Sequence, residues 1–246
     1  MITDRLPEKS KIHWPYIILF YVIAFSISAL FNSGFLTPEF RTLTQGYFIS
    51  DFTYLPACLG TFIAALWVLY LDKSHVRTIT FSGNYPLKNI ATALTPIVVF
   101  SIVGLNNEYR LNVHYFAFAF AAINLIYGIM EEIGWRGYLQ DALRPLSEKY
   151  RFLLIGLMWW AWHFRYHTVF DFTVFPLFCI AGSFLIGQLA EKTKSYLIAG
   201  AVHSLIILLT NSGQPSKEKI VASILTIIIW IGIDKWWQPE TEQLLL

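Results

Sequence analysis

Long apolar runs without charged residues constrain this chain more than any other feature. Crossing the hydrocarbon core of a bilayer, about 30 Å thick, takes about 20 helical residues. Six uncharged runs are near or above this length: Trp14–Leu36, Phe52–Leu71, Asn89–Leu105, Leu111–Met130, Phe172–Ala190 and Ser195–Thr210. Two shorter runs, Phe152–Phe164 and Ile220–Ile233, become long enough when their flanks are included. The pattern predicts an all-α, polytopic membrane protein, built as a bundle of about eight transmembrane helices.

Composition supports this class and excludes several others. Of the 246 residues, 56% are hydrophobic and 14% are charged, whereas soluble domains carry about 25% charged residues. The formal net charge of +2 does not indicate a basic surface that would bind nucleic acid. Both cysteines, Cys58 and Cys179, lie inside apolar runs, which does not suggest a disulfide framework or a metal cluster. We expect an integral, multi-pass membrane protein that forms a single transmembrane domain over residues 1–246.

The distribution of basic residues predicts an orientation. With the N-terminus inside, 13 of the 18 lysines and arginines fall on the inner side of the bundle. Five fall on the outer side, namely Arg41, Arg110, Arg165, Lys217 and Lys219. Basic residues concentrate in cytoplasmic loops. We therefore expect both termini in the cytoplasm, which agrees with an even number of spans.

Two adjacent acids, Glu131 and Glu132, directly follow the fourth apolar run. Hydrophobic residues resume after them, so we expect the helix to continue past Met130. Glu132 precedes Arg136 by four residues, which is the favourable order for an intrahelical ion pair. Glu131 has no such partner, and Asn124, two turns earlier, can share its face. Acids are also common in the headgroup layer, but an intramembrane acid is by default a functional candidate, and we favour that interpretation.

Histidines form the second set of candidates. His163 ends the fifth run, and His203 lies within the seventh, where apolar residues surround it on both sides apart from Ser204. His167 lies one turn beyond His163 and can line the same face, although its polar neighbours place it toward the outer interface. A buried histidine bonded to a backbone carbonyl would explain either His163 or His203 alone. Two such histidines together with an unpaired glutamate make that explanation weaker.

The same residues are compatible with two chemistries. A glutamate with two or three histidines is a plausible zinc set, but the chain has no HExxH motif and the candidates are spread over three predicted helices. Without a metal, a glutamate in an apolar and partly wet cavity can act as a general base on water. A histidine can then relay the proton or donate to a developing oxyanion. Spacing alone does not decide between these alternatives.

Three segments match motifs in order and spacing. Glu131-Glu132-x-x-x-Arg136-Gly137 matches EExxxRG, and Trp159-x-x-x-His163 matches FxxxH with Trp in place of Phe. His203 stands where HxxxN supplies its histidine. In these features the chain resembles the CAAX protease and bacteriocin-processing (CPBP, or Abi) family of intramembrane proteases. The resemblance covers a catalytic core at about residues 117–211, and the eight-helix plan extends it to most of the chain.

The resemblance implies an activity and assigns roles. The activity would be hydrolysis of a peptide bond in a membrane-associated peptide or protein, within the lipid bilayer of a bacterial cell membrane. Glu131 would be the general base, His163 its partner and His203 an oxyanion donor. Glu132 and Arg136 would form a supporting ion pair. We expect no cofactor and no nucleic-acid partner, with a divalent metal such as Zn²⁺ as the alternative; the candidates for lining the cavity are Asn124, Trp159, His167 and Ile207.

One position departs from the family pattern. The residue four after His203 is Ile207, where the third motif has an asparagine, and isoleucine has no group to donate. Asn211 is two turns away from His203, about 12 Å along a helix axis, too far to replace the missing donor without a bend. The oxyanion hole is therefore expected to be incomplete.

Two other functions compete with proteolysis. A catalytically weak relative could act by binding, for example in bacteriocin self-immunity, and Ile207 motivates this alternative. A transporter could use Glu131 and His203 as a proton relay, but this interpretation makes the three-motif match a coincidence. We rank it last.

Overall fold

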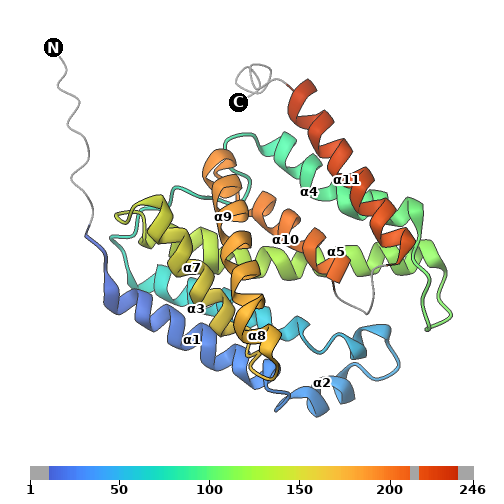
Figure 1. Cartoon of the computed structure of the whole chain (residues 1–246), viewed down its shortest axis with the longest axis horizontal. Helices are drawn as coiled ribbons and strands as arrows, with labels where there is room; N and C mark the ends of the chain where they lie inside the picture. Colours follow the sequence, from blue (N-terminus) through green and yellow to red (C-terminus); the bar gives the residue numbers. More distant parts are fainter. Residues whose placement is uncertain (1–10, 211–215, 238–246) are drawn as a thin grey trace.

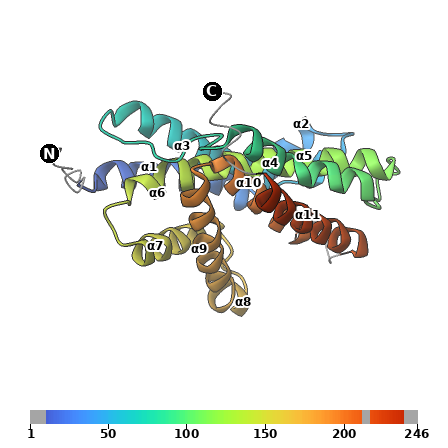
Figure 2. The ribbon, with the colours of Figure 1, turned by 90° about the horizontal axis from the view of Figure 1, so that it is seen from above.

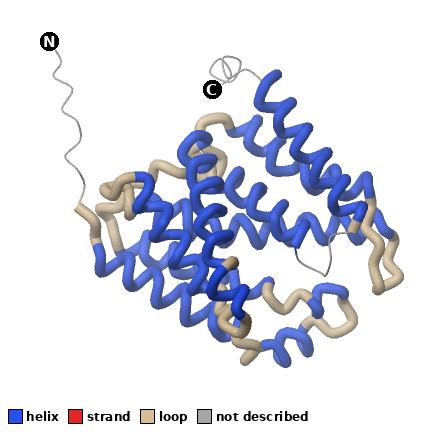
Figure 3. The backbone as a smooth tube through the Cα atoms, in the orientation of Figure 1, coloured by secondary structure: helices blue, strands red, loops and turns tan. Residues whose placement is uncertain are grey.

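The computed structural model of the chain describes residues 11–210 and 216–237. Within these residues the fold is all-helical, and its one β contact is an isolated bridge between Thr80 and Ser195 (Figure 3). The predicted all-α class is confirmed. Asn211 lies outside the described residues. Both chain ends, for which the sequence predicts a position in the cytoplasm, lie outside them as well.

Each of the eight apolar runs coincides with a helix. These helices are α1 (Trp14–Asn32), α3 (Cys58–Leu71), α4 (Pro86–Val103), α5 (Val113–Gly134), α7 (Glu148–Trp162), α9 (Phe175–Thr193), α10 (Tyr196–Thr210) and α11 (Lys217–Trp236). Three stretches of the described chain are long and apolar enough to cross a membrane: Trp14–Asn32, Pro86–Val103 and Val113–Ala142. Leu55–Leu71 and Tyr196–Thr210 are shorter apolar helices. The structure thus supports a membrane protein, and the number of eight spans stays a prediction.

Shorter elements connect the long helices. They are α2 (Thr37–Leu43), the 3₁₀ turns η1 (Phe48–Asp51) and η2 (Leu55–Ala57), the π-helical segment η3 (Trp135–Leu139), α6 (Gln140–Ala142) and α8 (Val169–Thr173). Because η3 and α6 follow α5 without a break, the helix continues well past Met130, as its sequence predicts. A π-helical turn is rare and is frequent at functional sites. Here it begins three residues after Glu132.

Helix α5 is central to the bundle. It packs against α10, α3 and α4, while α1 packs on α3 and α7 packs on α9 (Figures 1 and 2). Seen from above, α7, α8 and α9 extend on one side of α5, and α3 lies on the other (Figure 2). The candidate residues on α5 are therefore enclosed by other helices.

Glycines allow the close approach of α5 and α10. A Cβ atom on Gly128 would lie 2.6 Å from the carbonyl oxygen of Gly200, and a Cβ on Gly200 would lie 2.8 Å from the Cα of Ile129. Small residues at such crossings let helix backbones pack tightly, as is common between membrane helices. This contact brings the part of α10 that carries His203 against the part of α5 that carries the two acids.

Polar contacts join several loops at one end of the bundle. The Asp141 carboxylate accepts hydrogen bonds from the backbone N–H groups of Thr78 (2.6 Å) and Ile79 (3.1 Å). Arg144 pairs with Asp141 at 2.7 Å and with Glu191 at 3.2 Å. The loop over residues 72–85, the turn after α6 and the end of α9 are thereby held together, next to the ends of the helices that carry the candidate residues.

Candidate active site

Glu131 lies in the last turn of α5, and its side chain is fully buried. The indole N–H of Trp159, on α7, donates a hydrogen bond to Oε2 of Glu131 over 3.1 Å. Tyr127, one turn earlier on α5, lies beside the same carboxylate, whose Oε1 has no well-formed hydrogen bond among the described residues. One oxygen of Glu131 is thus held by Trp159, and the other is available as a proton acceptor.

Glu132 has different partners although it is the next residue. Its Oε2 forms an ion pair with Nε of Arg136 at 3.3 Å, and both side chains are fully buried. Its Oε1 accepts a hydrogen bond from Nδ1 of His203 at 2.9 Å. The expected ion pair is present, and His203 joins it. Because Nδ1 donates to the carboxylate, Nε2 is the histidine atom that remains for a substrate.

His163 caps the C-terminal end of α7 and is partly buried. Its Nδ1 lies 2.7 Å from the backbone carbonyl of Trp159. A carbonyl only accepts hydrogen bonds, so Nδ1 carries the proton and Nε2 is left as an acceptor. The structure shows no hydrogen bond between His163 and Glu131 within the described residues, and each of the two contacts Trp159.

Trp159 connects the candidate residues. Its ring centroid is 5.0 Å from that of His203 and 5.5 Å from that of His163. The guanidinium of Arg136 lies 5.8 Å from the same ring. The structure therefore brings together the residues of all three motifs, from α5 and η3, α7 and α10.

Two other residues that were predicted to line the cavity, Ile207 and Asn124, are buried. Ile207 is buried in an apolar cluster that also contains Tyr127. Asn124 is fully buried, donates from its amide to the carbonyl of Phe120 (2.8 Å) and accepts from the Tyr54 hydroxyl (2.8 Å). Its amide is thus already engaged on its own helix.

His167 lies apart from the other candidates. It is exposed, and its backbone N–H donates to Asp171 over 3.2 Å at the start of α8. Within the described residues no contact joins its side chain to Glu131, His163 or His203. The structure does not bring it to the site.

Two features of the site escaped the sequence reasoning. The first is the indole donor of Trp159: the exchange of Phe for Trp in the second motif was visible, and it adds an N–H group. The second is the bond between His203 and Glu132, which joins residues 71 positions apart. No spacing rule within one helix can find such a contact.

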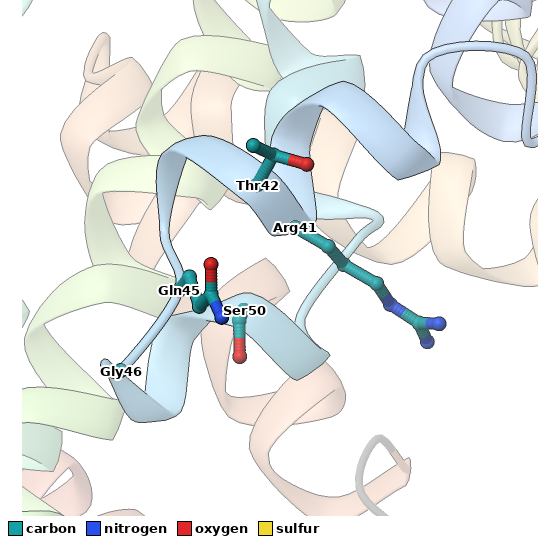
Figure 4. A pocket seen from close by; sticks show the side chains of 5 residues that line it. All are labelled: Arg41, Thr42, Gln45, Gly46 and Ser50. Atoms are coloured by element: carbon teal, nitrogen blue, oxygen red, sulfur yellow. The ribbon is translucent and has the colours of Figure 1, made fainter.

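Among residues 11–210 and 216–237, no three or more His, Cys, Asp or Glu side chains form a group that could hold a metal ion. A surface pocket lies elsewhere, between α2 and η1 (Figure 4), and it is lined by Arg41, Thr42, Gln45, Gly46 and Ser50. None of the candidate catalytic residues lines this pocket.

The arrangement is suited to general-base chemistry. A buried carboxylate with one anchored oxygen and one oxygen that lacks a well-formed hydrogen bond can take a proton from water, and a neighbouring histidine can donate to negative charge that develops on a carbonyl. Both functions need groups held in fixed positions, which the hydrogen bonds of Trp159 and Glu132 provide.

Comparison with known proteins identifies the domain that contains these residues. No curated protein matches the chain. A family model described as type II CAAX prenyl endopeptidase Rce1-like matches residues 113–209. This stretch runs from the start of α5 to the penultimate residue of α10 and includes Glu131, His163 and His203. The chain therefore carries, over residues 113–209, an Rce1-like domain of the CPBP family, which is the family that its three motifs resemble.

Proposed function

We propose that the chain is an intramembrane endopeptidase that hydrolyses a peptide bond of a membrane-associated peptide or protein. The Rce1-like domain supports a membrane protease as the kind of function. The observation that carries the proposal is the convergence of Glu131, Trp159 and His203 from three helices in a buried site. Burial matters because electrostatic stabilisation is stronger where water is excluded.

The proposed reaction begins at Glu131. Its Oε1 takes a proton from water as the water oxygen attacks the carbonyl carbon of the scissile bond. His203, held through Nδ1 by Glu132 and protonated on both ring nitrogens in this proposal, donates from Nε2 to the oxygen that becomes negative. Glu131 then gives its proton to the leaving nitrogen, so that OH adds to the acyl carbon and H to the amine. The acceptor Nε2 of His163 helps to orient the water.

Cleavage of a membrane-anchored peptide by the purified full chain in proteoliposomes tests this proposal. Product masses would identify the bond that is broken. Glu131→Gln removes the base while keeping the shape of the side chain, so we expect no measurable cleavage. Glu39→Gln, at an exposed acid of α2, is the matched control and should keep the wild-type rate. Equal activity of wild type and Glu131→Gln would refute Glu131 as the base.

We propose that the reaction needs no cofactor. Oε2 of Glu131 accepts from Trp159, and Glu132 is paired with Arg136 and His203, so the reaction above uses both acids without a metal. Cleavage is therefore expected to continue after dialysis against EDTA. Loss of activity that Zn²⁺ restores would replace this proposal with a metal-dependent one.

Ile207 supports a second candidate, a catalytically weak relative that acts by binding, as in bacteriocin self-immunity. Isoleucine at this position leaves the third motif without its amide donor. If the folded wild-type protein cleaves no peptide of a membrane-anchored library while it still binds some of them, this second function is preferred.

A further inference from the structure

We propose that Trp159 is the positioning residue of the candidate active site: its indole N–H fixes the Glu131 carboxylate, and its ring and carbonyl fix the two histidines. The inference rests on the proposed function, in which Glu131 is the base. The second motif of the family has phenylalanine at this position, which has no N–H group. This chain therefore has a donor that the motif itself does not provide.

The hydrogen bond to Glu131 has the features of a strong interaction. It joins a side chain that is 6% exposed to one that is 0% exposed, over 3.1 Å. Bonds to an ionised acceptor are about twice as strong as neutral ones. Because both groups are buried, bulk solvent does not replace a lost donor at Oε2, so the carboxylate depends on the indole for its orientation and for stabilisation of its charge.

Trp159 also sets the positions of both histidines. Its carbonyl accepts from Nδ1 of His163, which selects the tautomer with a free Nε2. Its ring meets the His203 ring nearly at a right angle, with an interplanar angle of 84°. Edge-to-face contacts of this kind favour one ring orientation. A single residue thus contacts the base and both histidines.

The neighbouring helix makes room for the indole. A Cβ atom on Gly182, in α9, would lie 3.1 Å from Cζ3 and 3.7 Å from Cη2 of Trp159. Both atoms belong to the six-membered ring of the indole. Contacts near 3.1 Å are tighter than ordinary packing, so any side chain at 182 would push on the ring.

Trp159 differs from the other two tryptophans of α7 in the acceptor that its indole contacts. The indole of Trp160 donates to the carbonyl of Asp171 (2.8 Å), and that of Trp162 donates to the hydroxyl of Ser28 (2.8 Å). Their acceptors are neutral, whereas the acceptor of Trp159 is a carboxylate. Trp162 is 1% exposed and lies on the same helix. Trp162→Phe is therefore a matched control for Trp159→Phe, because both delete the same atoms from a buried site.

The hydrogen bond can be tested without any activity. In protein labelled with ¹⁵N-tryptophan, the indole N–H resonance of Trp159 is the one that disappears in Trp159→Phe. We expect this resonance to move upfield in Glu131→Gln, where the acceptor loses its charge, while the resonance assigned through Trp162→Phe stays in place. If Trp159→Phe does not fold, Gly182→Ala identifies the resonance by shifting it. A Trp159 resonance that is unchanged in Glu131→Gln would overturn the inference whether or not the protein is a protease.

Kinetics then test positioning. Trp159→Phe should lower kcat by about 10²-fold with little change in KM, since misplacing a reacting group by about 1 Å has an effect of this size. Because a donor to the charged form favours that form, its loss should move the acidic limb of the kcat profile to higher pH. Trp162→Phe should keep the wild-type kcat and profile. Equal losses in both variants, or an unmoved acidic limb, would assign Trp159 a structural role. If Trp159 shows the expected resonance shift but the wild type cleaves nothing, the proposed function is wrong, and the hydrogen bond between Trp159 and Glu131 is still supported.

Discussion

At the scale of single residues, the two adjacent acids differ because of what surrounds them. Glu131 accepts from the neutral indole of Trp159 and has one oxygen without a well-formed hydrogen bond, whereas Glu132 contacts the cation Arg136 and the histidine His203. A residue that must change its protonation state needs an available atom. A residue that balances a buried charge needs its atoms engaged. The same side chain therefore supports two roles in consecutive positions.

Glu132→Gln is expected to destabilise the protein. It leaves the fully buried Arg136 without its counter-charge, and breaking a buried pair from one side costs about 3–5 kcal/mol. Folded yield and thermal stability in detergent measure this loss, with Glu131→Gln as the comparison, which should remain near wild type. Similar stability for the two variants would contradict the division of roles.

Ile207→Asn restores the residue of the third motif. If the site lacks a second oxyanion donor, kcat should rise with little change in KM, since such a donor acts mainly in the transition state and is typically worth about 10²–10³ in rate. If another group already fills this role, the buried amide should leave kcat unchanged and cost about 1–3 kcal/mol as an unpaired polar group. Parallel measurements of kcat, KM and thermal stability separate the two results. A large fall in activity with unchanged folding would contradict both and show that the side chain at 207 shapes the substrate pocket.

At the scale of elements, the crossing of α5 and α10 determines whether Glu132 and His203 can meet. Gly128 and Gly200 lie at this crossing, and neither has space for a Cβ atom. The 72–85 loop also links separate elements, because Asp141 and Arg144 tie it to the turn after α6 and to the end of α9.

Gly200→Ala is predicted to separate these helices. Its Cβ would meet the backbone of Ile129 at 2.8 Å, which cannot be relieved by rotating a side chain. Overpacking of this kind costs about 1–3 kcal/mol, and the displaced His203 should also lower kcat. Gly232→Ala on α11 is the control, since its Cβ would meet only the movable, exposed ring of Trp236. Equal thermal stability of the two variants would argue against a tight crossing.

The attachment of the 72–85 loop should depend on pH. Burial lowers the pKa of His75 below 6.5, against the opposing effect of Asp141 and Asp72, while Arg77 and His13 lower it further. A histidine with a lowered pKa is protonated more readily in the detached loop, so the attachment is strongest above pH 6.5 and weakens as the pH falls below it. Amide hydrogen exchange of the loop at pH 7 and pH 5, with each rate divided by the intrinsic rate at that pH, should show less protection at pH 5. His75→Phe should reduce that difference, and an unchanged difference would point to another group.

At the scale of the whole molecule, contacts join loops that the charge pattern assigns to the same side. Lys88 near the start of α4 pairs with Asp234 near the end of α11 at 3.0 Å. At the opposite ends of these two helices, the amide of Asn106 donates to Glu218 over 3.3 Å. Each predicted side of the bundle is thus internally connected, as expected for a protein with two aqueous faces.

The orientation of these faces is a prediction from the basic residues. In intact cells, a membrane-impermeant maleimide should label Glu108→Cys, in the exposed loop before α5, and should not label Lys73→Cys. Lys73→Cys should react only after the cells are permeabilised. The two native cysteines are buried and provide a low background. The reverse labelling pattern would show that the bundle has the opposite orientation.

Much of the fold could be predicted because it depends on local patterns. Uncharged runs of the right length form helices wherever backbone groups must be satisfied without water, and all eight runs coincide with helices in the described structure. The ion pair between Glu132 and Arg136 was also predictable, because it depends on a four-residue spacing within one helix. The three motifs predicted the family of the domain at residues 113–209 for the same reason, since each is a short, contiguous pattern.

Only the tertiary structure decided which of these residues meet. The bonds from His203 to Glu132 and from Trp159 to Glu131 join positions 71 and 28 residues apart. They depend on how closely α5, α7 and α10 approach, which is set by glycines and ring packing that hydropathy does not encode. The exposed position of His167 and the engaged amide of Asn124 likewise depend on neighbours from other parts of the fold. The sequence by itself determined the helices and the candidate chemical groups, and tertiary packing determined their partners, because contacts between helices depend on three-dimensional distance and not on separation along the chain.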